Sequence, residues 1–346
     1  MIKEVLGVGF VVISLLCMLP SSAAASSDTD FKWGLVAYHV NFPGYELYPD
    51  DFLRIAGNGI QWIRIDFAWG RLEPTRDAPF DFTYFDMVVQ EARKNGLRIV
   101  GTLGTGYNTL QRPVAPLWTQ ALSGGDYARK IAQYADAVVE RYAADVDAWA
   151  LENEQHLALI HVLTRWRFRL FRPEINDRIM LALSDAVQEY DPTAEAILTV
   201  SAAGFEPFVR RMEGLIQFDS IGLYTYPVSF VPFVVEPDGF DEQIANEIAL
   251  VKSVADGRDV ILLETGYQTP TPGLGRTESL QARYIESIAR SAVDGGAQGL
   301  FIYQYLDNPD EWLPREEAFG LVRADGERTP KPAWIRYGEV IQAYTP

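Results

Sequence analysis

Two apolar stretches of the sequence end abruptly in carboxylates. The stretch that begins at Trp149 ends in Asn153-Glu154, and the stretch Val260-Ile-Leu-Leu ends in Glu264. A carboxylate at the end of a buried strand is costly unless it is solvated or hydrogen-bonded, so two of them need an explanation. Cleavage of a glycosidic bond requires a pair of carboxyl groups, one acting as acid and base and the other acting at the anomeric carbon. Glu154 and Glu264 supply such a pair if one fold brings both ends together.

Alternating strands and helices predict a fold that does so. Short β-branched apolar runs predict eight strands, over residues 31–40, 61–67, 97–103, 146–151, 196–200, 219–223, 260–263 and 299–303. Amphipathic patterns predict the helices between and after them, over residues 50–57, 84–95, 126–142, 174–190, 207–216, 241–256, 278–294 and 331–344. Thr277 is well placed to cap the helix over 278–294.

Eight strand–helix pairs in one chain favour a single α/β domain. Their strict alternation demands a parallel sheet, and about 320 residues is the size of a (β/α)8 barrel, the TIM barrel. Alternation alone also fits an open doubly wound sheet, but no glycine-rich dinucleotide turn follows the first predicted strand. Reactive residues of such barrels lie at the C-terminal ends of the strands, where both glutamates are expected.

Several short motifs, taken in order, resemble glycoside hydrolase clan A. This is the retaining superfamily of cellulases, mannanases, β-xylosidases and β-galactosidases, with Asn-Glu closing strand four and Glu closing strand seven. Asn153-Glu154 and Glu264 fit that pattern. Further matches extend over nearly the whole mature chain: Trp62-Ile-Arg64-Ile-Asp66, Tyr190-Asp191-Pro192, Asp219-Ser-Ile-Gly-Leu-Tyr-Thr-Tyr226-Pro227, Gln281-Ala282, Phe319-Gly-Leu321 and Lys331-Pro332-Ala-Trp334.

The resemblance implies a role for each central residue. Glu264 would attack the anomeric carbon to give a covalent glycosyl-enzyme, and Glu154 would protonate the leaving oxygen and later deprotonate water. Arg64 would keep Glu264 ionised and oriented, because a guanidinium favours the charged form of a neighbouring carboxyl. Asn153 would bind the sugar 2-hydroxyl, and Tyr226 would hold Glu264. The chain would thus be a retaining O-glycosyl hydrolase acting on a β-linked saccharide.

Aromatic and imidazole side chains near other strand ends are further candidates for substrate binding. Most clan members have a tryptophan at the end of strand eight, where this sequence leaves Tyr303, Tyr305 and Trp312 as alternatives for stacking on a sugar ring. Trp118 lies in a segment that resembles an aromatic loop of the clan, and Tyr224 stands where many members have histidine. His39 closes the first strand, as a substrate contact or as a core histidine. No cluster has metal-ligand spacing, so the sequence predicts neither a metal nor another cofactor.

The net charge of the chain restricts the kinds of molecule that it is expected to bind. There are 30 basic and 47 acidic residues, a net charge of −17, which disfavours nucleic acid and favours a neutral saccharide as substrate. Residues 1–25 resemble a signal peptide, since the apolar run over 5–19 is short for a membrane span and Ala23-Ala-Ala25 offers a cleavage site. We therefore expect secretion of a catalytic domain over 26–346 to the periplasm or the extracellular space, with an uncleaved anchor as the alternative.

Two apolar segments and the glutamate pair leave other functions open. The segments 156–172 and 227–235 follow strands four and six, so we expect them to pack together as a lid over the site. A patch that contacts a membrane or a partner protein is the less favoured alternative. A transglycosylase would use the same two glutamates, whereas an inactive carbohydrate-binding barrel would need neither of them.

Overall fold

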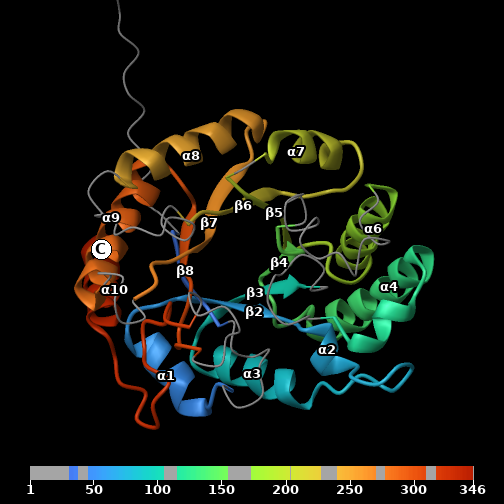
Figure 1. Cartoon of the computed structure of the whole chain (residues 1–346), viewed down its shortest axis with the longest axis horizontal. Helices are drawn as coiled ribbons and strands as arrows, with labels where there is room; N and C mark the ends of the chain where they lie inside the picture. The colour runs from blue at the N-terminus through green and yellow to red at the C-terminus, as the bar shows by residue number, and fades with distance from the viewer. Residues whose placement is uncertain are drawn as a thin grey trace, which may run out of the picture. The chain divides into compact units, whose positions relative to one another are not determined.

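Eight parallel strands form the centre of the molecule. The computed structural model describes residues 31–37, 46–104, 115–154, 173–202, 204–226, 240–269, 277–308 and 317–345. The strands close into a barrel in the order of the sequence (Figure 1). They are β1 (Lys32–Val36), β2 (Trp62–Asp66), β3 (Arg98–Leu103), β4 (Ala148–Leu151), β5 (Glu195–Ser201), β6 (Ser220–Tyr224), β7 (Asp259–Thr265) and β8 (Gly299–Ile302). The predicted (β/α)8 barrel is confirmed.

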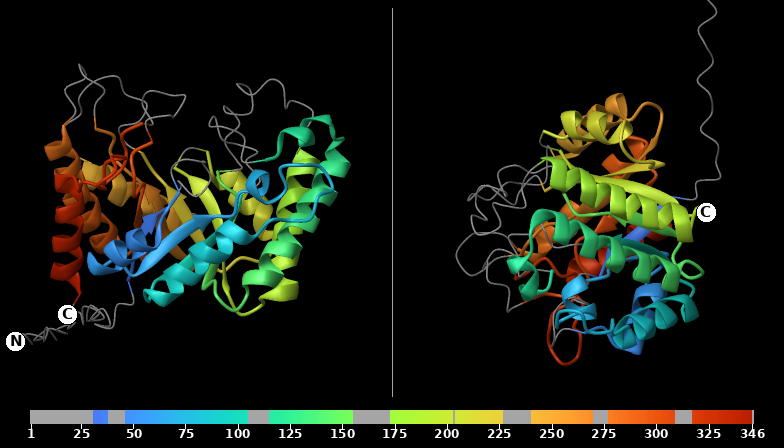
Figure 2. Two further views of the ribbon diagram at one scale, coloured as in Figure 1. Left: turned by 90° about the horizontal axis from the view of Figure 1, so that it is seen from below. Right: turned by 90° about the vertical axis from the view of Figure 1, so that its right-hand side faces the viewer.

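The helices surround this barrel. They are α1 (Pro49–Gly57), α2 (Trp69–Leu72), α3 (Thr83–Lys94), α4 (Gly124–Tyr142), α6 (Pro173–Tyr190), α7 (Glu206–Glu213), α8 (Phe240–Val254), α9 (Glu278–Asp294) and α10 (Pro332–Tyr344), with a 3₁₀ helix η2 (Leu117–Ala121). Figure 2 shows α10 on one flank and α4 with α6 on the opposite flank, with the strands between them. The first and last strands also pair, with Leu35 opposite Ile302, so the sheet has no free edge.

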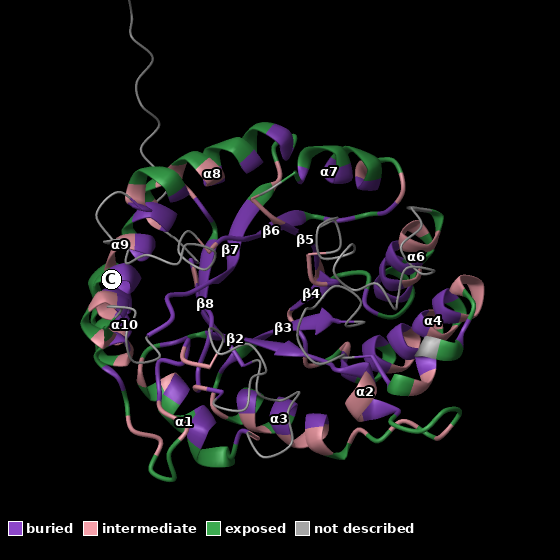
Figure 3. Cartoon of the chain, in the orientation of Figure 1, coloured by how far each residue is buried: buried purple, intermediate pink, exposed green. Residues whose placement is uncertain are grey.

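The core has two layers because side chains alternate along each strand. In β4, Ala148 and Ala150 belong to the cluster inside the barrel, whereas Trp149 and Leu151 pack outward in the cluster beneath the helices. In Figure 3 the strands are buried except at some of their end residues, and the outer faces of the helices are exposed. The indole nitrogen of Trp149 donates to Asp191 Oδ2 at 2.9 Å, so the Tyr-Asp-Pro motif before β5 ties that strand to β4.

The predicted elements are found in the predicted order. Each of the eight strands and each of the eight helices overlaps its predicted range, and the Thr277 side chain caps α9 by accepting from the Leu280 amide. The short helices α2 and η2 were not predicted, because four or five residues carry no helical periodicity. No helix in the described ranges is long and apolar enough to cross a bilayer. The predicted signal peptide lies outside those ranges and stays a prediction.

Candidate active site

The glutamate of β7 is held at both carboxylate oxygens. Glu264 is 8% exposed, Arg64 Nη1 donates to its Oε2 at 2.5 Å, and the Tyr226 hydroxyl donates to its Oε1 at 2.6 Å. Burial raises the pKa of Glu264 above its usual range, while the Arg64 guanidinium and the Tyr226 hydroxyl both act to lower it. The expected effect of Arg64 is therefore present, but burial outweighs it in the protein without substrate.

The arginine of β2 connects several strand ends. Arg64 is fully buried, its Nε donates to Thr102 Oγ1 at 2.9 Å, and its Nη2 donates to Asn153 Oδ1 at 3.2 Å. Nη2 also lies 3.1 Å from Asp66 Oδ1. One cation thus joins β2, β3, the end of β4 and β7. This network brings Arg64 to Glu264, as the resemblance implied, and joins Asn153 to Arg64; the catalytic roles of all three stay predictions.

Two partners of Arg64 were not among the predicted site residues. Asp66 stands two positions after Arg64, so strand alternation places both on the same face, and this spacing could have identified it. Thr102 lies on β3, and its contact with Arg64 follows from the pairing of Arg64 with Val100, which no local sequence pattern reveals.

The Glu152-Asn153-Glu154 segment leaves β4 with an unusual backbone. Glu152 has a φ of 65° and Glu154 a φ of 52°, in the left-handed region that non-glycine residues adopt at a cost of roughly 1–3 kcal/mol each. Glu152 is fully buried, and its Oε2 accepts the Asn153 amide at 2.9 Å, so its side chain supports this turn. Glu154 is partly exposed at the barrel mouth. Strain of this kind concentrates at functional sites, where the surrounding fold holds a side chain in a required direction.

Tyr224 lies beside the same group. The guanidinium carbon of Arg64 is 4.9 Å from the centre of its ring, and the ring is 1% exposed. Burial raises the pKa of Tyr224 well above its usual range, Arg64 opposes this rise, and the charges of Glu264 and Glu154 add to it. Glu154 is therefore within electrostatic reach of Tyr224. Among the described residues the Tyr224 hydroxyl has no hydrogen-bond partner. Because its pKa is raised, the hydroxyl stays protonated and can donate a hydrogen bond.

An aromatic group lies next to the nucleophile candidate. The ring of Tyr226 meets Tyr303 edge to face at 6.0 Å and Phe319 at 5.7 Å. A Cβ at Gly266 would collide with the Tyr303 carbonyl oxygen, so the glycine after Glu264-Thr265 lets the end of β8 come close to β7. Tyr303 therefore lies at the end of β8 beside Tyr226, and its role in stacking on a sugar stays a prediction.

Of the remaining candidates the structure describes Trp118, which does not join this group. Trp118 packs edge to face on Trp69, and its indole nitrogen donates to the Glu73 carbonyl at 3.0 Å. Its role in sugar stacking stays a prediction. His39 and Trp312 lie outside the described residues, as do segments 156–172 and 227–235 of the expected lid. Among the side chains that the structure describes, no three histidine, cysteine, aspartate or glutamate residues cluster in a way that could hold a metal ion.

Comparisons with known proteins give a partial sequence match and a shared barrel fold. A family model described as beta-galactosidase matches residues 44–121, the segment that contains Arg64. A beta-amylase from Bacillus cereus is 30% identical over 107 residues, which cover 29% of this chain and only 20% of the amylase. The β-glycosidase BGL167 superposes with a TM-score of 0.70 at 19% identity, over 92% of this chain and 97% of that one. A family 1 β-glucosidase from Thermotoga maritima gives 0.69 at 15% identity, over 91% and 98%.

The matched segment 44–121 and the shared barrel fold agree with the resemblance to clan A. The family model and the glycosidase folds support a glycosyl hydrolase. The chain departs from the clan pattern at Tyr224, where many members carry histidine, and at the end of β8, where most carry tryptophan and Tyr303 is one of the alternatives. Tyr224 lies next to Arg64 and Tyr303 next to Tyr226, so both departures change side chains around Glu264.

Proposed function

We propose that this clan A glycosyl hydrolase cleaves β-linked, neutral saccharides with retention of configuration. Glu264 is the nucleophile and Glu154 is the acid and base. The observation that supports this proposal most is the clamp on Glu264, where Arg64 and Tyr226 each hold one carboxylate oxygen. A carboxylate fixed in this way, at the end of β7 and in one network with Asn153, is suited to attack a carbon atom in a defined direction.

The reaction proceeds in two displacements. Glu264 attacks the anomeric carbon, the glycosidic bond breaks, and Glu154 gives its proton to the leaving oxygen. Water then attacks the same carbon, Glu154 takes a proton from it, and the bond to Glu264 breaks. Each displacement inverts the anomeric centre, so the product keeps the configuration of the substrate. The carboxyl groups of enzymes with this mechanism stand about 5 Å apart.

Neighbouring side chains orient the sugar. Arg64 donates to Asn153 Oδ1 and thereby fixes the amide that is proposed to bind the sugar 2-hydroxyl. The neutral hydroxyl of Tyr224 is a second donor beside Arg64, and Tyr303 offers a ring next to Tyr226. Substrate distortion and hydrogen bonds to the sugar that strengthen in the transition state together stabilise it by several kcal/mol.

The first test is turnover of aryl β-glycosides and neutral β-glucans, mannans, xylans and galactans by the chain from residue 26 onward. We expect release of product from at least one β-linked substrate, with the β-anomer appearing first in proton NMR spectra. Release of the α-anomer first would contradict retention. Turnover of α-glycosides alone, or of none of these substrates by folded protein, would contradict the proposed substrate class.

Tyr226→Phe tests the clamp on the nucleophile. The pKa of Glu264 should rise because the carboxylate loses a donor, and Glu264 must be ionised to attack. The acidic limb of the kcat/KM profile should therefore move to higher pH by about one unit, since a hydrogen bond to a charged group contributes ~1.5 kcal/mol. Tyr337→Phe is the control, because it removes a buried hydroxyl that donates to the Gly34 carbonyl instead. An acidic limb that stays in place in Tyr226→Phe would argue against the clamp.

A further inference from the structure

The residues that hold Glu264 alternate with residues that face the helices. At the end of β6, Tyr224 and Tyr226 belong to the cluster inside the barrel, so Thr225 between them faces outward. On β7, Glu264 faces inward and the next residue, Thr265, faces outward. Thr225 is 3% exposed and Thr265 is fully buried, so neither hydroxyl is satisfied by solvent.

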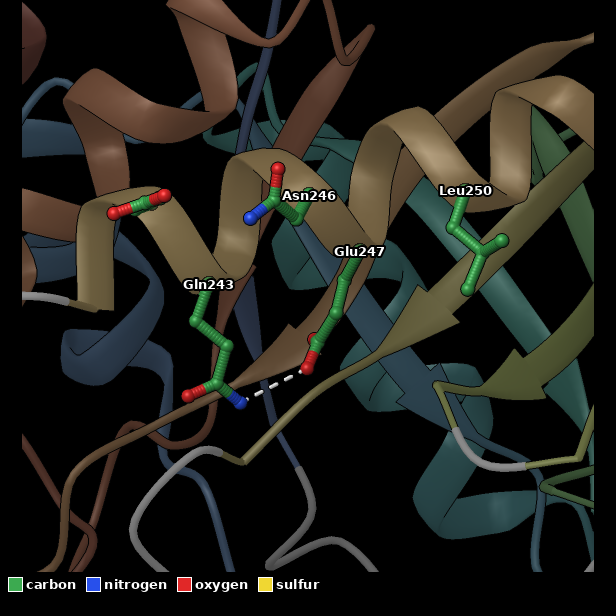
Figure 4. Close-up of a pocket in the computed structure, with 5 residues that line it drawn as sticks. Gln243, Asn246, Glu247 and Leu250 are labelled. Atoms are coloured by element: carbon green, nitrogen blue, oxygen red, sulfur yellow. Dashed lines mark hydrogen bonds between the residues drawn. The ribbon is translucent and has the colours of Figure 1, made fainter.

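Each outward threonine is bound by a helix. The Thr225 hydroxyl donates to Glu247 Oε2 of α8, and the Thr265 hydroxyl forms a 2.7 Å hydrogen bond with the Tyr284 hydroxyl of α9. Figure 4 shows Glu247 on the face of α8 that lines a hollow of about 430 Å³, with Gln243 beside it. Gln243 Nε2 donates to the other oxygen of Glu247 at 2.9 Å, so this carboxylate is itself fixed.

Thr225 also contacts the nucleophile candidate directly. Its amide donates to the Glu264 carbonyl at 3.0 Å, and the following residue, Tyr226, donates to the Glu264 carboxylate. The regular ladder between β6 and β7 shifts register between Leu223 and Tyr224, just before this point. The side-chain bond to Glu247 therefore fixes the end of β6 where the backbone pairing is irregular.

We propose that Thr225 and Glu247 are positioning residues, which hold Tyr226 and the backbone of Glu264 in the geometry for attack. This inference rests on the proposed role of Glu264. In this proposal a residue of α8, which lies outside the barrel, helps to position the side chains inside the barrel. A misplacement of about 1 Å at a reacting group can cost as much as ~100-fold in rate, so an anchor of this kind has a measurable effect.

The ionisation of Glu264 reports on this geometry. The charged and titratable groups that face Glu264 are Arg64 and Asp66 from β2 and Tyr224 and Tyr226 from the end of β6. Both tyrosines adjoin Thr225 in the chain, and of the two it is Tyr226 that donates a hydrogen bond to Glu264. If Thr225 loses its anchor, the hydrogen bond from Tyr226 lengthens and the pKa of Glu264 rises, while the contacts of Arg64 persist.

The test compares Thr225→Val, which keeps the shape and loses the hydroxyl, with Thr225→Ser, which keeps the hydroxyl. Thr225→Val should lower kcat about tenfold with little change in KM and shift the acidic limb to higher pH, and Thr225→Ser should retain both. Glu247→Leu should act like Thr225→Val. Glu242→Gln changes an exposed carboxylate that lines the same hollow and should behave as the wild type.

A second measurement does not need turnover. The carboxyl band of Glu264, identified by infrared difference against Glu264→Gln in the full chain, gives its pKa without substrate. A raised pKa in Thr225→Val with wild-type unfolding by urea supports the anchor. An unchanged pKa and kcat, equal losses in Thr225→Ser, or a loss of stability alone would overturn it. Full activity of Glu264→Ala would instead refute the proposed function, and the titration would still decide on the anchor.

Discussion

Glu264→Ala is expected to lower kcat on an activated aryl β-glycoside by on the order of 10⁴-fold or more. The variant has no group that can form the covalent glycosyl-enzyme, so both displacements are lost. Direct attack by water would require a base on the face of the sugar that Glu264 occupies, and Arg64 and Tyr226 supply none there. Initial rates from wild type and variant at equal concentrations of folded protein give the ratio.

Azide makes this prediction more specific. In Glu264→Ala, azide can take the place of the missing carboxylate and attack the anomeric carbon once, which yields an α-glycosyl azide. In Glu154→Ala, an activated leaving group still allows Glu264 to form the intermediate. Azide then attacks in the second displacement and yields a β-glycosyl azide. Proton NMR of the products distinguishes the two configurations, so each glutamate is assigned by its own product.

The matched control is Glu286→Ala, which removes an exposed carboxylate of α9 and should leave turnover unchanged. Products of the same configuration from both variants would show that the assignment of the two glutamates is wrong. Wild-type turnover by Glu264→Ala would show that the reaction does not use this residue. Neither outcome can come from loss of folding, because a misfolded variant would neither form a glycosyl azide nor turn over the substrate.

The order of the strands and helices could be predicted because apolar residues recur with a spacing typical of each kind of element. The inner positions of β4 are Ala148 and Ala150 and its outer positions are Trp149 and Leu151, so the strand is apolar on both faces, as a buried parallel strand must be. Amphipathic helices alternate with such strands, which restricts the topology to a few arrangements. The four residues of α2 carry no such period, and their helix follows from tertiary contacts such as the packing of Trp69 on Tyr134.

The site could be predicted only in part, because its contacts depend on barrel closure. Arg64 and Glu264 are 200 positions apart in the sequence. Their contact was expected because each lies in a motif that resembles clan A. Thr102 carries no motif, and Phe319 lies in the matched segment Phe319-Gly-Leu321 but was not predicted as a site residue. Thr102 reaches Arg64 through the register of β2 and β3, and Phe319 reaches Tyr226 from a segment after β8. Neither contact could be inferred without the closed sheet.

Arg64→Met is expected to lower the free energy of unfolding by about 3–5 kcal/mol, the usual cost of breaking a buried ion pair by removing one partner. The guanidinium is fully buried between Glu264 and Asp66, and methionine fills its volume without supplying a charge or a donor. Both carboxylates then remain buried without their cation. Urea unfolding followed by tryptophan fluorescence measures the loss.

The pH dependence of that loss identifies its cause. Burial raises the pKa of Glu264 and Arg64 lowers it, so without Arg64 the pKa rises further above its value of about 4.3 in the unfolded chain. A carboxyl with a raised folded pKa destabilises the fold while it is charged, and this penalty disappears as the pH falls through that pKa. The stability deficit of Arg64→Met should therefore be largest near pH 8 and smaller near pH 5.

A second substitution and a surface control complete this prediction. Arg64→Met with Glu264→Gln removes one of the two unpaired charges, so it should recover at least ~1 kcal/mol of the loss, as coupled neighbours do. Arg141→Met breaks the pair between Arg141 and Asp86, whose side chains are 45% and 41% exposed, and should cost less than ~1 kcal/mol. Equal costs for the buried and the exposed arginine would mean that the Arg64 network does not stabilise the barrel. A deficit independent of pH would mean that lost packing, and not unpaired charge, is what Arg64→Met measures.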